Sequence, residues 1–213
     1  MAGALILAAL GGGTVAVFIA LRLWVVFHHQ VVPRESLSLL VVAGSGGHTT
    51  EILRLLGNLS NAYSPRHYIF ADTDEMSAHK IRSFELDRAE RYSSTVYTTD
   101  RIPRSREVRQ SWLSTVLTTL YSMLYSFPLT FRLKPDLVLC NGPGTCVPIC
   151  LSALLLGILG IKKVIIVYVE SVCRVETLSL SGKILYYLSD YFVVQWPTLK
   201  EKYPKSVYFG RIV

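Results

Sequence analysis

A glycine turn that ends in a histidine is the stretch of this sequence best suited to chemistry. It follows an apolar run at residues 39–43 and consists of Gly44, Ser45, Gly46 and Gly47, with His48 and Thr49 directly after it. An apolar-periodic segment comes next, so the pattern predicts a buried strand, a tight loop and the first turn of a helix. Free backbone N–H groups in such a loop bind phosphate or diphosphate. The imidazole of His48 could transfer a proton near neutral pH.

The glycine pattern differs from two common phosphate-binding motifs. A dinucleotide fingerprint has the order Gly-x-Gly-x-x-Gly, but Thr49 occupies the third glycine position here. A P-loop requires Gly-Lys-Ser/Thr, and this turn contains no lysine. A plain strand-to-helix turn, with His48 as a capping residue, is the structural alternative to a phosphate site.

A second glycine turn and a carboxylate end two later apolar segments. This second turn contains Asn141, Gly142, Pro143, Gly144 and Thr145. It ends a strand that begins near residue 137, and Glu170 ends the strand at 163–169. The carboxyl ends of parallel strands meet at one edge of a sheet, where open α/β proteins bind their ligands. We therefore expect both turns and Glu170 to line one anion-binding crevice.

Strands and helices alternate along the rest of the chain. Strands are expected at residues 38–43, 67–71, 95–98, 137–140, 163–169, 191–194 and 206–209. Helices are expected at residues 48–59, 76–88, 108–131, 147–159, 179–188 and 197–203. This order predicts an α/β fold over residues 38–213, a Rossmann-like open parallel sheet with helices on both faces. The helix at 108–131 is more apolar than one core face requires, so part of it could lie at a membrane surface.

Residues 1–28 predict a retained transmembrane anchor. Residues 2–20 carry no charged side chain, and the apolar run continues past Arg22, which is long enough to cross a bilayer. A cleaved signal peptide would have a basic start and a shorter apolar core. Because Arg22 and Arg34 lie on the C-terminal side, the positive-inside rule places the body of the protein, after a linker at 29–37, in the cytosol.

The composition favours an anionic ligand or membrane surface over nucleic acid. The net charge of +7 suits an anionic leaflet or an anionic substrate, and the sequence contains no recognised nucleic-acid motif. The four cysteines lie in or beside apolar runs without disulfide or zinc-site spacing. We therefore expect reduced thiols and no metal site.

The two glycine turns and one strand end resemble a known family closely. The matching residues are Gly44 to Glu51, Asp136 with Asn141 to Thr145, and Tyr168-Val169-Glu170-Ser171. They resemble the membrane-anchoring subunits of the endoplasmic reticulum UDP-N-acetylglucosamine transferase, and the resemblance spans essentially the whole chain. The N-terminal half of the bacterial lipid II-forming GlcNAc transferases, which have the GT-B fold, is similar more distantly. The resemblance implies the acceptor-binding half of a split GT-B enzyme that adds the second GlcNAc to GlcNAc-pyrophosphate-dolichol.

The resemblance also implies roles for individual residues. Both glycine turns, with Thr49, would bind the acceptor diphosphate, and either Glu170 or His48 would act as the general base. Glu170 could equally be a structural carboxylate beside a helix N-terminus. A separate soluble subunit would bind UDP-GlcNAc and dock against the C-terminal tail, which consists of Gly210, Arg211, Ile212 and Val213.

The same resemblance implies a place and a set of partners. The complex would act at the endoplasmic reticulum membrane, with this chain spanning once and its N-terminus in the lumen. It would need no cofactor beyond its two substrates, UDP-GlcNAc and dolichol-pyrophosphate-GlcNAc. This chain would be inactive alone, and the preceding GlcNAc-1-phosphate transferase is a further possible partner.

Two other functions fit parts of the pattern. A membrane-tethered dinucleotide-dependent oxidoreductase would use Asp72, at the end of the strand at 67–71, to bind the cofactor ribose. The missing third glycine argues against it. A purely structural anchor, whose glycine turns perform no chemistry, is the other alternative.

Overall fold

A computed structural model describes residue 13, residues 16–26, residue 28, and residues 35–92, 96–107 and 110–213. Much of the predicted anchor at 1–28 and of the linker at 29–37 therefore lies outside the described residues. Among the described residues, no helix is both long and apolar enough to cross a membrane.

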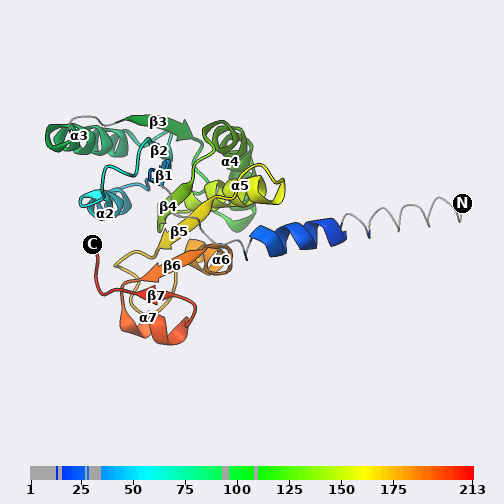
Figure 1. The fold of residues 1–213 in the computed structure, drawn as a ribbon. Coiled ribbons are helices and arrows are strands. Elements are labelled where there is room, and N and C mark those ends of the chain that lie inside the picture. The colour runs from blue at the N-terminus through cyan, green and yellow to red at the C-terminus, as the bar shows by residue number, and fades with distance from the viewer. Residues whose placement is uncertain (1–12, 14–15, 27, 29–34, 93–95, 108–109) are drawn as a thin grey trace, which may run out of the picture.

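The body of the chain is a sheet of seven parallel strands in the order β3-β2-β1-β4-β5-β6-β7 (Figure 1). The strands are β1 (Leu39–Val42), β2 (Arg66–Ala71), β3 (Tyr97–Ile102), β4 (Leu137–Asn141), β5 (Ile165–Val169), β6 (Tyr191–Val194) and β7 (Val207–Tyr208). The strand order reverses at β1, which pairs with β2 on one side and β4 on the other. The glycine turns after β1 and β4 therefore lie next to each other at the switch point, where such sheets bind ligands.

Helices connect successive strands and cover both faces of the sheet. They are α2 (Gly47–Leu56), α3 (Glu75–Arg91), α4 (Trp112–Leu133), α5 (Cys146–Ile158), α6 (Leu180–Leu188) and α7 (Pro197–Lys202). Leu40 and Val42 of β1 belong to one core cluster, together with α5 residues such as Leu156. The alternate residues Leu39 and Val41 belong to the other cluster, with residues of α2 and α3. The period-two alternation of a strand thus divides the core into two layers.

The Rossmann-like parallel sheet expected from the sequence is confirmed, although some strand bounds differ. The largest difference is at the strand expected at 95–98, which is β3 and runs from Tyr97 to Ile102. β3 lies at the sheet edge and is largely exposed, so it lacks the apolar alternation that identifies a buried strand.

Helix α4 has an unusual distribution of side chains. Its buried side carries the small polar residues Ser122, Ser126 and Thr130. The hydroxyls of the last two bond to the carbonyls four residues earlier, which satisfies them inside the helix. Its solvent side carries large apolar side chains, and Leu117 and Leu124 are 62% and 71% exposed. A helix that turns its leucines outward requires an apolar partner or an apolar medium.

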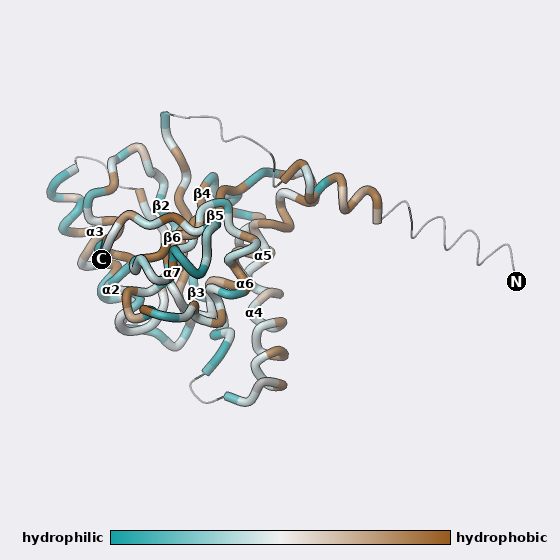
Figure 2. Tube along the Cα trace, turned by 90° about the horizontal axis from the view of Figure 1, so that it is seen from below, coloured by the Kyte–Doolittle hydropathy of each residue, from teal (hydrophilic) through white to brown (hydrophobic). Residues whose placement is uncertain are grey.

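The N-terminal helical segment at residues 16–26 packs against the end of α5. Arg22 donates from Nε to the Ile158 carbonyl at 2.9 Å and from Nη2 to the Gly157 carbonyl at 2.8 Å. A cation at these carbonyls is favourable because the C-terminal end of a helix carries partial negative charge. Val26 is buried beside Gly157, where an added Cβ would lie 3.0 Å from Cγ2 of Val26. Figures 1 and 2 both place α4 on the side of the molecule from which this segment extends.

Candidate functional site

The turn between β1 and α2 leaves backbone donors open. Gly46 is the N-cap of α2 with a φ of 63°, a left-handed value that favours glycine, and no side chain caps the helix. The N–H groups of Ser45, Gly46 and Gly47 donate to no acceptor among the described residues. A Cβ added at Gly46 or Gly47 would meet nothing within 4 Å, and residues 45–47 are all exposed. The turn therefore has unpaired N–H groups at the protein surface, as an anion site requires.

Thr49 and Gly44 lie on the buried side of this turn and hold it in place. Thr49 is fully buried, and its hydroxyl bonds to the Gly44 carbonyl and lies 2.6 Å from the Ser77 hydroxyl. Its side chain is therefore occupied inside the fold, although it was predicted to contact the diphosphate. A Cβ on Gly44 would lie 2.6 Å from the Pro143 ring, so glycine is needed where the two turns touch.

His48 contacts the second glycine turn through Asn141. Nδ1 of the half-buried imidazole lies 3.2 Å from Oδ1 of Asn141. Nε2 has no protein partner among the described residues. Gly142 has a φ of 70°, and a Cβ there would lie 2.5 Å from Cε1 of His48. The ring thus packs directly on the glycine backbone, which limits how far it can turn.

A buried carboxylate that the sequence analysis did not single out orients this pair. Glu51 lies on α2 and accepts from Nδ2 of Asn141 at 3.0 Å and from the Ser171 hydroxyl at 2.8 Å. A carboxylate only accepts, so the Asn141 amide must turn its NH2 toward Glu51 and its oxygen toward His48. That oxygen can only accept, which places the imidazole proton on Nδ1 and leaves Nε2 free to take a proton. The carboxylate three residues after His48, on the same helix, was the sequence signal for this role.

Glu170 lies deeper in the protein. It is 0% exposed, and its carboxylate accepts from the N–H and hydroxyl of Ser179, both at 3.0 Å, and from the Ser171 N–H at 3.1 Å. Burial raises the pKa of Glu170, while these donors act in the opposite direction. The contacts match the structural alternative, a carboxylate that holds the N-terminus of α6. A role as general base remains a prediction.

The second glycine turn contributes another helix N-terminus. Gly144 is exposed, whereas Asn141 and Gly142 are buried. Thr145 is buried at the N-cap of α5 and makes no side-chain cap hydrogen bond. The structure thus brings together the two turns, which come from segments about 100 residues apart in the sequence.

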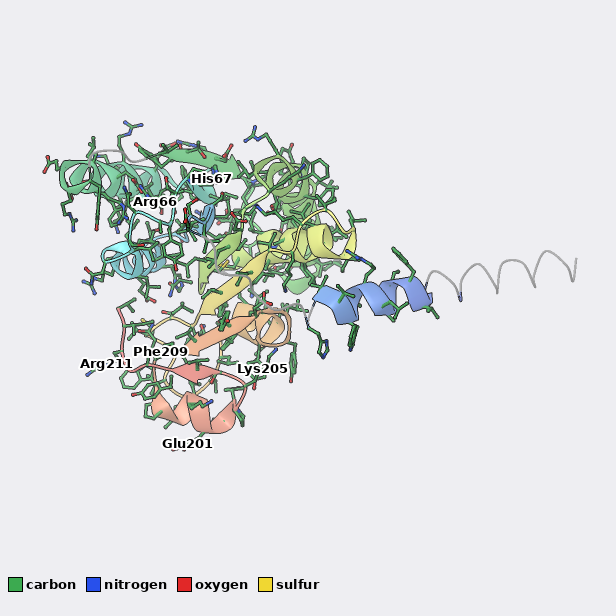
Figure 3. All side chains as sticks on the ribbon, in the orientation of Figure 1. Arg66, His67, Glu201, Lys205, Phe209 and Arg211 are labelled. Atoms are coloured by element: carbon green, nitrogen blue, oxygen red, sulfur yellow. The ribbon has the colours of Figure 1, made fainter. Side chains whose placement is uncertain are left out.

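The C-terminal tail lies close to the carboxyl end of β6. The Ile212 N–H donates to Oε1 of Gln195 at 3.2 Å, and the Arg211 guanidinium lies 5.4 Å from the Trp196 ring centroid. Phe209 is 71% exposed. Figure 3 shows Phe209 and Arg211 on the side of the molecule away from the N-terminal segment, and Figures 1 and 2 both place the chain end beside α2.

Metal binding has no support in the described part of the chain. No group of three or more His, Cys, Asp or Glu side chains is placed there to hold a metal ion. Cys140, Cys146 and Cys150 are buried free thiols, and burial raises the pKa of Cys146.

The parallel sheet, with a glycine turn and an uncapped helix N-terminus at its switch point, defines a Rossmann-like α/β protein. The chain belongs to the family described as "Oligosaccharide biosynthesis protein Alg14 like", whose model matches residues 39–212. Two similar relatives are both called UDP-N-acetylglucosamine transferase subunit ALG14. The one from Homo sapiens is 78% identical over 98% of each chain, and the one from Mus musculus is 73% identical over 100% of each chain.

A solved structure supports the fold. The crystal structure of Acinetobacter baumannii MurG matches with a TM-score of 0.53 at 16% identity. The match covers 76% of this chain and 42% of the MurG chain. The family match and these relatives, which are named as subunits of a UDP-N-acetylglucosamine transferase, confirm the resemblance inferred from the glycine turns. Membership of this family favours that prediction over the oxidoreductase alternative.

Proposed function

We propose that this chain is the membrane-anchoring, acceptor-binding subunit of a UDP-GlcNAc transferase. The enzyme adds the second GlcNAc to GlcNAc-pyrophosphate-dolichol at the endoplasmic reticulum membrane, and a separate soluble subunit binds UDP-GlcNAc. The main support is the glycine turn after β1, whose N–H groups have no protein acceptor in the described chain and lie next to the oriented imidazole of His48. The relatives are named as UDP-N-acetylglucosamine transferase subunits, which supports the transferase part of the proposal.

The acceptor diphosphate binds at the N-terminus of α2. The N–H groups of residues 45–47 donate to its oxygens, and the positive end of the helix dipole adds to the attraction. The second turn, with Gly144 exposed at its surface, lines the other side of the diphosphate. Both turns act through backbone atoms, which are held in place before the ligand arrives.

His48 is the general base in this proposal. As the acceptor hydroxyl oxygen bonds to the anomeric carbon of the donor sugar, its proton passes to Nε2. The bond from that carbon to the UDP oxygen breaks, and UDP leaves with the electron pair. Asn141 and Glu51 hold the tautomer in which Nε2 can accept. Glu170 acts as a structural carboxylate, because it accepts from the N–H and hydroxyl of Ser179, at the N-terminus of α6, and from the Ser171 N–H.

The membrane side of the protein is the face that carries α4 and the N-terminal segment. The apolar face of α4 and the exposed apolar side chains of residues 17–25 point to an apolar medium. The chain spans the membrane once, with its N-terminus in the lumen and its body in the cytosol. The soluble subunit docks near the C-terminal tail, where Phe209 and Ile212 are exposed close to the end of β6. The preceding GlcNAc-1-phosphate transferase is a further partner at the same membrane.

Reconstitution tests the proposal. The full chain is purified in detergent with and without a soluble UDP-sugar-binding subunit captured from the same membranes, and transfer from labelled UDP-GlcNAc to GlcNAc-pyrophosphate-dolichol is measured. We expect transfer only from the pair. Robust transfer by this chain alone would reject the split enzyme. Full activity of a His48→Ala complex would instead favour a structural anchor.

A further inference from the structure

An apolar groove runs between α4 and α6, beside the second glycine turn. Its volume is about 320 Å³. Val116 and Leu120 of α4 form one wall, and Leu180 and Ile184 of α6 form the other. Val147, in the first turn of α5, also lines it. Apolar side chains thus surround a space of the size that small ligands occupy.

One end of this groove meets the site of the proposed diphosphate. Gly144 lines the groove and belongs to the glycine turn that contacts His48 through Asn141 and Gly142. Arg106 lies beside it, because a Cβ on Gly144 would be 3.9 Å from the Arg106 Cβ. Arg106 also lines the groove, and its positive charge complements the charge of a phosphate.

The other side of the groove continues into the apolar surface of α4. Val116 and Leu120 line the groove and are also more than half exposed to solvent, at 56% and 53%. They belong to the same outward face as Leu117 and Leu124. The groove therefore connects the glycine turn with the surface that the proposed function places against the membrane.

The geometry points to one occupant: the groove binds the isoprene units closest to the diphosphate of a polyisoprenyl acceptor. This inference rests on the proposed function and extends it from the head group to the lipid chain. A polyisoprenyl diphosphate joins an anion directly to an apolar chain, so its binding site must place an anion seat next to an apolar channel. The N–H groups of the glycine turn form the anion seat, and the groove between α4 and α6 forms the apolar channel.

The groove also explains how a lipid-borne sugar reaches the catalytic base. Burial of the first isoprene units lifts the diphosphate out of the bilayer surface and holds it at the glycine turn. The apolar chain beyond the groove passes over the outward face of α4 into the membrane. Recognition of the chain then lowers the KM for long acceptors, since each methylene group removed from water adds to binding.

Chain-length dependence tests the inference. The complex of the full chain with its soluble subunit is assayed in one detergent with two acceptors, GlcNAc diphosphate on a long polyisoprenol and on a single isoprene unit. For the wild type, we expect a KM about tenfold lower for the long acceptor, because only that acceptor fills the groove. Equal KM values for the two acceptors would overturn the groove assignment while leaving the proposed function intact. Absence of transfer to both would reject the proposed function itself.

Two variants with matched controls test whether the groove causes the preference for the long acceptor. Ile184→Trp fills the groove from α6, and Leu120→Gln makes its α4 wall polar. Tyr187→Trp and Leu117→Gln are the controls, because both side chains are exposed on the same helices but do not line the groove. We expect the two groove variants to lose the preference for the long acceptor and to use the short one like the wild type. If the control Leu117→Gln loses the preference equally, the chain binds the general apolar surface and the groove assignment is wrong.

Discussion

Replacing Asn141 by leucine tests how the fold orients His48, because it removes the oxygen that lies 3.2 Å from Nδ1. In the wild type, Glu51 accepts from the NH2 group of Asn141 at 3.0 Å, so the amide turns its oxygen toward the imidazole. Leucine is similar in size and has neither donor nor acceptor, so the variant no longer holds the imidazole proton on Nδ1. Nε2 can then carry the proton, and in that tautomer it cannot act as a base.

The expected loss follows from the role of a general base. Proton transfer by a positioned side chain contributes about 10²–10⁴-fold to an enzymatic rate. The wrong tautomer removes most of that contribution, so we expect kcat to fall about 100-fold, equivalent to about 2.7 kcal/mol in the activation free energy. The KM for the lipid acceptor should change little, because the backbone N–H groups of the glycine turn are untouched. Stability should fall by about 1–3 kcal/mol, because the variant removes the Asn141 donor from the buried carboxylate of Glu51.

Steady-state transfer by the reconstituted complex distinguishes a fall in kcat from a change in KM. The kcat and the KM are determined separately for the wild type and Asn141→Leu, with complex assembly checked by size-exclusion chromatography. Ser171→Ala is the control, because it removes one bond to Glu51 and leaves the Asn141 oxygen beside His48, and it should lose only a few-fold in kcat. A wild-type kcat in an assembled Asn141→Leu complex would refute the proposed orientation of His48.

Three further variants address the turn, the structural carboxylate and the core. Gly142→Ala should lower kcat by about 10²-fold, because its methyl group would displace the imidazole of His48 from the second turn. Burial raises the pKa of Glu170, so this carboxyl stabilises the fold most at low pH, and its contribution is lost as pH rises through the folded pKa. The melting temperature of Glu170→Gln should therefore improve relative to the wild type as pH rises from about 4 to 8. Arg66→Met should cost about 3–5 kcal/mol in the free energy of unfolding, because it leaves the carboxylate of Glu85, now 2.8 Å from the guanidinium, buried without its partner.

Each of these expectations has a contrary result. A wild-type kcat for Gly142→Ala would show that the position of the His48 imidazole against Gly142 does not matter for catalysis. A difference in melting temperature that stays constant with pH would show that Glu170 has no raised pKa. Glu75→Gln is the control for the buried pair, because Glu75 forms an exposed ion pair with Arg101 and should change stability by less than about 1 kcal/mol.

The glycine turns and the strands before them could be predicted because they depend on neighbours in the sequence. Turn chemistry needs glycine where φ is positive, and a buried parallel strand needs a run of apolar residues, so both leave a local pattern. The meeting of the turns followed from one rule of topology, that parallel strands end at the same edge. The weak edge strand β3 was displaced in the prediction because an exposed edge needs no such pattern.

The sequence by itself determined the fold class, the two open turns and the presence of a histidine at their junction. Only the tertiary structure decided which carboxylate serves the histidine. Both Glu51 and Glu170 are glutamates, so the sequence does not distinguish their roles. Helix α2 brings Glu51 to Asn141, whereas Glu170 follows β5 and is buried beside the N-terminus of α6. The physical reason is that hydrogen-bond partners 90 residues or more apart, as for Glu51 with Asn141 and Ser171, are set by the packing of helices on the sheet and leave no periodic signal along the chain.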